Sequence, residues 1–171
     1  MRWMWVDRIL ELVPGERAVA IKNVTMAEEH LHDHFPAGDG LSADPVMPMS
    51  LIVEGMAQTA GILVGRTRDF REKVILAKVS NAELGLDARP GDQLRYSAVL
   101  LQIGDQGAST SGTVEIRSAG SEAFVPAGSI DLMFSHIDNN TSGLSFPEHN
   151  FVFSDAFHEL LARSGYSFEP G

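Results

Sequence analysis

Three histidines stand at alternate positions in the segment EEHLHDHFPAGDG, namely His30, His32 and His34. On a β-strand, alternate side chains point to one face, so imidazoles at this spacing could bind zinc or nickel. Pro36 and the glycine-rich residues after it favour a loop, and the sequence offers no second cluster of ligands. We therefore expect no metal and no other cofactor. Two interpretations remain: a solvated loop, or one imidazole that accepts a proton near neutral pH.

Glu54 is the second residue that could take part in a reaction, because its carboxyl group lies in a segment, 48–65, that is apolar nearly all the way round. A helix of this kind is buried, and Pro48 suits its first position and Gly65 its end. Burial would raise the pKa of Glu54 and keep part of it protonated, ready to donate a proton. Gln58, one turn later, could orient this carboxylate or bind water. A carboxylate near a helix start is also favoured by the helix dipole alone.

Strand-like segments surround this helix in the sequence. In residues 17–25, Val19, Ile21 and other apolar residues appear among β-branched neighbours and polar breaks, as in a half-buried strand. Four further strand-like runs follow the helix: 73–84, 93–103, 108–117 and 123–134. The connections between the later runs are short turns, which join antiparallel neighbours, whereas parallel strands need long crossovers. We expect an α+β domain over residues 1–134, with an antiparallel sheet wrapped around one long buried helix.

The rest of the chain, 135–171, is expected to be an extension. Residues 135–143 read as a polar linker, and a short amphipathic helix follows. Ser154 is placed to cap this helix and Gly165 to end it. The extension would dock either on its own domain or on a partner subunit, through an apolar stripe formed by Phe157, Leu160 and Leu161.

Charge and composition exclude several classes of function. The 171 residues carry a formal net charge of -10, which repels nucleic acids and anionic membrane surfaces. There is no cysteine, so disulfides, thiolate metal sites and a thiol nucleophile are excluded. The sequence has no apolar run of the roughly 18 residues that a membrane-spanning helix needs. We therefore expect a cytoplasmic protein that binds neither membrane nor nucleic acid.

Six short motifs occur in a fixed order: VDRILEL (6–12), AIKNVT (20–25), HFP (34–36), PVMP (45–48), LIVEGMAQTAG (51–61) and PGDQL (90–94). Each motif is weak alone, but the ordered set is specific. Over residues 6–134 the chain resembles the beta-hydroxyacyl-acyl-carrier-protein dehydratases of fatty acid and polyketide synthesis, which have the hot-dog fold.

The resemblance implies a site shared across a homodimer or a larger assembly of dimers. It implies that His34 is the base and Glu54 its acidic partner, and a glutamate there accompanies relatives that dehydrate without isomerising. The substrate would be a 3-hydroxyacyl thioester of acyl carrier protein or coenzyme A. The free amides of Met49 and Ser50 at the helix start could bind the thioester oxygen. Further substrate-binding residues would be Gln58, Phe35 and Pro36.

Two departures from the family pattern bear on activity. Eight residues, 37–44, stand where the family usually has two, between the proposed base and the helix. They could widen the pocket, gate it or displace His34. Met49 replaces a glycine whose amide binds the thioester oxygen, and a side chain would obstruct the site if glycine geometry were required. These changes favour a specialised or impaired member of the family.

An acidic carrier protein would need a local basic patch on this acidic chain. The segment after the long helix supplies four cations, to which Arg89 and Arg95 could add: Arg66, Arg68, Arg71 and Lys73. A solvated helix end explains the same charges. Two other functions stay open: a thioesterase in which Glu54 activates water, and a non-catalytic acyl-binding or scaffolding subunit.

Overall fold

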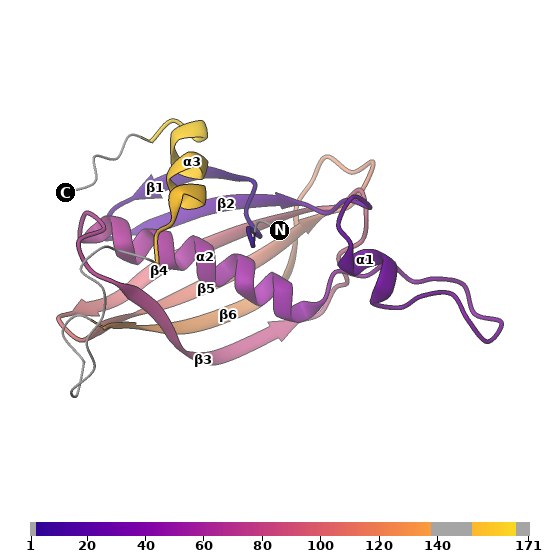
Figure 1. The fold of residues 1–171 in the computed structure, drawn as a ribbon, viewed down its shortest axis with the longest axis horizontal. Coiled ribbons are helices and arrows are strands. Elements are labelled where there is room, and N and C mark those ends of the chain that lie inside the picture. The colour runs from indigo at the N-terminus through magenta and orange to yellow at the C-terminus, as the bar shows by residue number, and fades with distance from the viewer. Residues whose placement is uncertain (1–2, 138–151, 167–171) are drawn as a thin grey trace.

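The computed structural model describes residues 3–137 and 152–166, in which one long helix lies across a curved antiparallel sheet (Figure 1). The elements in chain order are β1 (Arg8–Val13), β2 (Arg17–Asn23), α1 (His30–Asp33), α2 (Met49–Thr67), β3 (Val74–Leu84), β4 (Gln93–Gly104), β5 (Gly107–Arg117), β6 (Val125–His136) and α3 (Asp155–Arg163). No helix of the described residues is long and apolar enough to cross a membrane.

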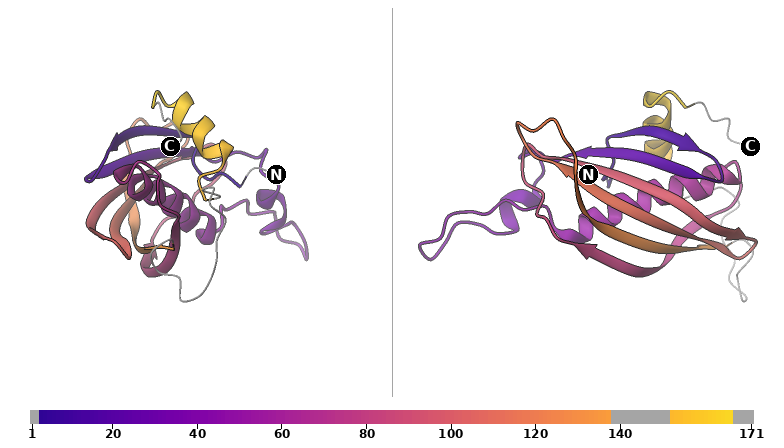
Figure 2. Two further views of the ribbon diagram at one scale, coloured as in Figure 1. Left: turned by 60° about the vertical axis from the view of Figure 1, so that its left-hand side comes forward. Right: turned by 180° about the vertical axis from the view of Figure 1, so that it is seen from behind.

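The six strands pair antiparallel in the order β1-β2-β4-β5-β6-β3. Short turns join β4 to β5 and β5 to β6, as the turn residues predict. The sheet curves around α2, which is visible from both sides of the molecule (Figure 2). The α+β hot-dog architecture expected from the sequence is thus confirmed. The strand β1 is an addition, since the sequence patterns did not predict it.

Helix α2 is buried along most of its length, and Met56, Ala60 and Leu63 have no accessible surface. It approaches the sheet closely at Gly55, where an added Cβ would lie 2.5 Å from Oη of Tyr96 on β4. A helix that is apolar on nearly every side needs to be buried in this way on most of its surface.

The boundaries of α2 differ slightly from the prediction. Pro48 is the N-cap with ψ of 135°, and not the first helical residue, so the helix begins at Met49. Gly65 does not end the helix, which continues to Thr67. The reason for a glycine here is close packing, because an added Cβ would lie 2.4 Å from Cζ of Phe153.

A projecting arm, residues 35–44, follows α1 (Figure 1). At its base the amide of Asp44 donates to the carbonyl of Phe35 across 3.0 Å, and the carboxylate of Asp44 pairs with Arg89. At its tip Gly38 and Leu41 form an isolated antiparallel bridge. Asp39 and Gly40 turn the chain there with φ of 48° and 81°, the left-handed region that such tight turns require. The inserted residues 37–44 therefore form a small hairpin that points away from the sheet.

Helix α3 packs on its own chain, which is one of the two docking surfaces predicted for it. Leu160 and Leu161 are buried in the same hydrophobic core as α2. The amide of Ile9 on β1 donates to Oγ of Ser164 across 2.9 Å. Ser154 is the N-cap, although its side chain makes no capping hydrogen bond. The predicted polar linker begins inside β6, which extends to His136, and its residues 138–143 lie outside the described part of the chain.

Candidate active site

The three histidines do not share a face, because His30 and His32 lie in the single turn of α1 and not on a strand. Nε2 of His32 lies 2.8 Å from the carbonyl oxygen of Met26. The ring of His30 packs edge-on against Trp5, with centroids 5.0 Å apart, and burial lowers its pKa. Within residues 3–137 and 152–166, no group of three or more His, Cys, Asp or Glu side chains could hold a metal.

His34 comes directly after α1, and its ring is fixed by the backbone that leads into α2. Nδ1 lies 2.8 Å from the carbonyl oxygen of Val46. A carbonyl can only accept a hydrogen bond, so Nδ1 carries the proton and Nε2 of the neutral ring has a free lone pair. The side chain is exposed in the single chain and stacks at a tilt on Phe35, with ring centroids 4.3 Å apart. This tautomer leaves Nε2 able to accept a proton.

Glu54 is partly buried on α2, and Gln58 fixes its carboxylate. Nε2 of Gln58 donates to Oε1 of Glu54 across 2.9 Å and to the carbonyl of Trp3 across 3.0 Å. Oε1 of Gln58 accepts from the amide of Trp5 across 2.8 Å. Both ends of the Gln58 amide are therefore engaged, which makes Gln58 a positioning residue for Glu54. No sequence pattern indicates the part played by the backbone of residues 3–5, because backbone amides and carbonyls are common to all residue types.

Met49 and Ser50 are exposed at the start of α2, and neither amide has an acceptor among the described residues. The amide of the next residue, Leu51, donates a hydrogen bond to the carbonyl of Pro48. The two free amides lie at the positive end of the helix dipole, where they can bind a developing negative charge. Met49 has an ordinary negative φ, so this position does not need a glycine for its backbone conformation.

Glu54 opens on a cavity of about 280 Å³ between α2, the beginning of β3 and the segment before α3. The lining residues are Glu54, Ala57, Gln58, Gly61, Ile62, Val74, Ile75, Leu76, Phe134, Val152, Phe153 and Phe157. His34 is not among them, and Phe35 and Pro36 lie beside it at the base of the arm. A single chain thus presents the proposed base and the proposed acid on different parts of its surface.

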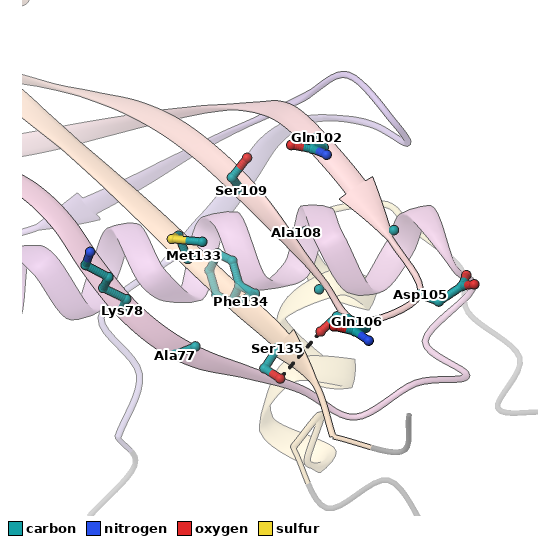
Figure 3. A pocket seen from close by; sticks show the side chains of 12 residues that line it. Ala77, Lys78, Gln102, Asp105, Gln106, Ala108, Ser109, Met133, Phe134 and Ser135 are labelled. Carbon is teal, nitrogen blue, oxygen red and sulfur yellow. Dashed lines mark hydrogen bonds between the residues drawn. The ribbon is translucent and has the colours of Figure 1, made fainter. Parts of the chain in front are cut away.

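A larger hollow of about 610 Å³ lies around the β4–β5 turn, and Phe134 lines both it and the cavity beside Glu54 (Figure 3). It contains none of the residues predicted for the site. Its polar side chains include Lys78, Gln102 and Asp105, and Figure 3 shows Asp105 and Gln106 at the turn itself. Size alone therefore does not identify the active site of this protein.

The predicted basic patch is largely neutralised by neighbouring carboxylates. Arg66 pairs with Asp69 across 2.7 Å, and Arg68 lies 3.6 Å from Asp105. Arg89 pairs with Asp44 and Asp87, and Arg95 with Glu115. Among the described residues, the structure pairs Arg71 with no carboxylate.

Comparison with known proteins identifies the family. A family model described as the FabA-like domain matches residues 2–123. The chain therefore belongs to the family of beta-hydroxyacyl-acyl-carrier-protein dehydratases, as the ordered motifs indicate. A curated relative, the 3-hydroxyacyl-acyl-carrier-protein dehydratase FabZ of Geobacter metallireducens, is 47% identical over 96 residues. That match covers 54% of this chain and 60% of the relative.

Solved structures with low sequence identity share the fold. The dehydratase heterocomplex ApeI:P of Xenorhabdus doucetiae has a TM-score of 0.57 at 17% identity and covers 78% of this chain and 83% of its own. An acyl-coenzyme A hydrolase of Staphylococcus aureus has a TM-score of 0.53 at 14% identity, covering 87% and 84%. These likenesses support the fold alone, which a dehydratase complex and an acyl-coenzyme A hydrolase share.

Proposed function

We propose that this protein removes water from 3-hydroxyacyl thioesters to give trans-2-enoyl thioesters, with acyl carrier protein as the carrier. A coenzyme A thioester is the alternative substrate. The observation that carries the proposal is the 2.8 Å contact between Nδ1 of His34 and the carbonyl oxygen of Val46, which leaves Nε2 free to take a proton. The match to a dehydratase at 47% identity supports the same chemistry.

In the proposed reaction, Nε2 of His34 takes a proton from C2 of the acyl group. Negative charge then grows on the thioester oxygen, and the free amides of Met49 and Ser50 bind it. The protonated Glu54 gives its proton to the C3 hydroxyl, the C3–O bond breaks and water leaves. Transfer of the proton from the imidazolium to the carboxylate then restores both groups.

The proposal requires two copies of the chain, because one copy does not put His34 in the cavity that Glu54 lines. The free edge of the sheet supports a dimer. At the opposite edge, α3 binds the β1 amide of Ile9, whereas residues 75–80 of β3 are all exposed. Apolar side chains on this strand include Ile75, Leu76 and Val79. An uncovered strand of eleven residues is well suited to pair with its own copy about a two-fold axis.

The assay is the reversible hydration of a crotonyl thioester, followed on the wild type and on His34→Ala and Glu54→Gln. Loss of a positioned acid or base should lower turnover by roughly 10²- to 10⁴-fold. His32→Ala is the matched control, because it removes an exposed imidazole from the same segment. Wild-type turnover that persists in both active-site variants would refute the assignment.

A thioesterase is the second candidate, favoured by the presence of Glu54 in a cavity without an imidazole. Glu54 would then activate water for cleavage of the acyl–sulfur bond. Release of free thiol from a saturated acyl thioester, which cannot be dehydrated, separates this activity from the proposed one. Tight acyl binding with neither product would indicate a non-catalytic subunit.

A further inference from the structure

The cavity beside Glu54 has the character of a site for a hydrocarbon chain. Glu54 and Gln58 are its polar side chains, and the other ten lining residues are aliphatic, aromatic or glycine. Burying methylene groups against such walls is favourable, because it removes apolar surface from water. Gly61 keeps the passage along α2 open, since the helix has no side chain there, and its nearest neighbour is the ring of Phe134.

One wall of this cavity comes from outside the part of the chain that matches the family. Val152, Phe153 and Phe157 line it, whereas the match to the FabA-like domain ends at residue 123. The closure of the cavity on this side is therefore a property of the extension.

Phe153 is held firmly in this wall. Its side chain is only 5% exposed, and its ring lies edge-on to Phe70 with centroids 4.7 Å apart. It packs directly on Gly65, where any side chain would collide with it. Phe157 stands beside it, with ring centroids 5.9 Å apart, and is only partly buried.

The positions along α2 give the direction and the length of the cavity. Glu54 and Gly61 are seven residues apart, so the lined part of the helix extends about 10 Å from the carboxylate. Phe153 lies over Gly65, about one turn further along. A chain that passes Glu54 and follows α2 would therefore meet the two phenyl rings.

We propose that Phe153 and Phe157 of the C-terminal extension form the end wall of the acyl site and limit the length of chain that the protein accepts. This inference rests on the proposed function, since it assigns the cavity beside Glu54 to the acyl group. It adds to that function a preferred class of substrate, namely thioesters with short and medium acyl chains.

The test uses inert thioether analogues of acyl-pantetheine with butyryl, octanoyl, dodecanoyl and hexadecanoyl chains, measured by calorimetry on the full-length protein. In the wild type, affinity should rise from butyryl to octanoyl and then fall. In Phe157→Ala, the dodecanoyl analogue should gain at least about tenfold relative to the octanoyl one, because the added methylenes find room. Phe153→Ala should act in the same direction.

Phe124→Ala is the matched control, because it removes a phenyl ring that lies under Arg95 and Arg117, away from this cavity. Its length preference should equal that of the wild type. Phe157→Ala decides the question even if Phe153→Ala does not fold. An unchanged length preference in Phe157→Ala, or a wild type that binds none of the analogues, would overturn the inference.

Turnover measured on the same chain lengths separates the two proposals. A shifted length preference in binding, without dehydration of any substrate, would refute the proposed reaction and support the end wall. Dehydration with the same length preference in wild type and Phe157→Ala would support the reaction and refute the end wall.

Discussion

Nε2 of Gln58 donates a hydrogen bond across 2.9 Å to Oε1 of Glu54, one helical turn earlier on α2. The same amide group binds the backbone at Trp3 and Trp5. The N-terminal segment is thereby attached to the proposed acid through one side chain. A displacement of this segment can therefore change the position of the Glu54 carboxylate without contacting it.

Replacing Gln58 should show whether this residue positions Glu54 or binds the substrate. We expect Gln58→Leu to lower kcat about tenfold with little change in KM, because Glu54 loses the donor that orients it. Steady-state kinetics with a crotonyl thioester measure both constants.

Thr59→Ala is the control for Gln58→Leu, because it removes a buried hydroxyl that bonds to the Gly55 carbonyl and not to Glu54. It should lower stability while kcat stays the same. Equal losses of kcat in the two variants would mean that Gln58 acts only through the stability of the helix.

Gly55→Ala should destabilise the protein by about 1–3 kcal/mol, measured by urea unfolding, because its methyl group would collide with Tyr96. Tyr96 cannot move aside easily, since it is fully buried, and burial raises the pKa of its phenol and keeps it neutral. Gly61→Ala is the control: its methyl group would lie 3.6 Å from Phe134, and it should be tolerated. A neutral Gly55→Ala would contradict the close packing of α2 on β4.

The exposed edge of β3 predicts the effect of a charge on assembly. We expect Val79→Lys to convert dimers to monomers in light scattering, and to abolish turnover although His34 and Glu54 are unchanged. Val99→Lys places the same charge on an exposed position of the inner strand β4 and should leave assembly intact. A fully active dimer carrying Val79→Lys would exclude β3 as the dimer edge.

The ion pair at the base of the arm predicts a dependence on pH. The hydrogen bond from Arg89 lowers the pKa of Asp44 below its ordinary value. The pair therefore contributes at every pH above that ordinary value, near 4, and is lost as the pH falls through the lowered value. Hydrogen exchange at residues 37–44, corrected for intrinsic rates, should be constant from about pH 5 to 8 and accelerate in acid.

Arg89→Ala should produce the faster exchange of the arm already at neutral pH. The effect should be at most about fivefold, because the pair is exposed to solvent. Asp87→Asn, which removes the more distant carboxylate from Arg89, is the control and should change little. Slow exchange that survives in Arg89→Ala would show that backbone hydrogen bonds alone hold the arm.

Sequence patterns predict the parts of this fold that are long and regular. Helix α2 is a long segment that is apolar nearly throughout, and the strands β2 to β6 are strand-like runs, most of them separated by turn residues. β1 escapes such a search because a bulge between Ile9 and Glu11 interrupts its alternation, so that the buried side chains of Ile9 and Leu12 are three residues apart. The single turn of α1 depends on the burial of Leu31, a tertiary contact that no local pattern reveals.

The same distinction applies to the site. The spacing of Glu54 and Gln58 on one helix places them one turn apart, and the structure has them bonded. The tautomer of His34 depends on a carbonyl twelve residues away, and the phenyl rings of Phe153 and Phe157 come from about a hundred residues beyond Glu54. Contacts of this kind are created by the fold, so the sequence suggests the groups proposed to react but not their surroundings.

The bond between the Ile9 amide and Ser164 spans 155 positions of the chain. A ribosome releases β1 long before it releases α3, so the nascent sheet must remain with one edge unsealed while most of the protein is being made. Loss of Ser164 or of the apolar face of α3 would prolong that vulnerable interval, and the expected consequence in the cell is a lower yield of folded protein.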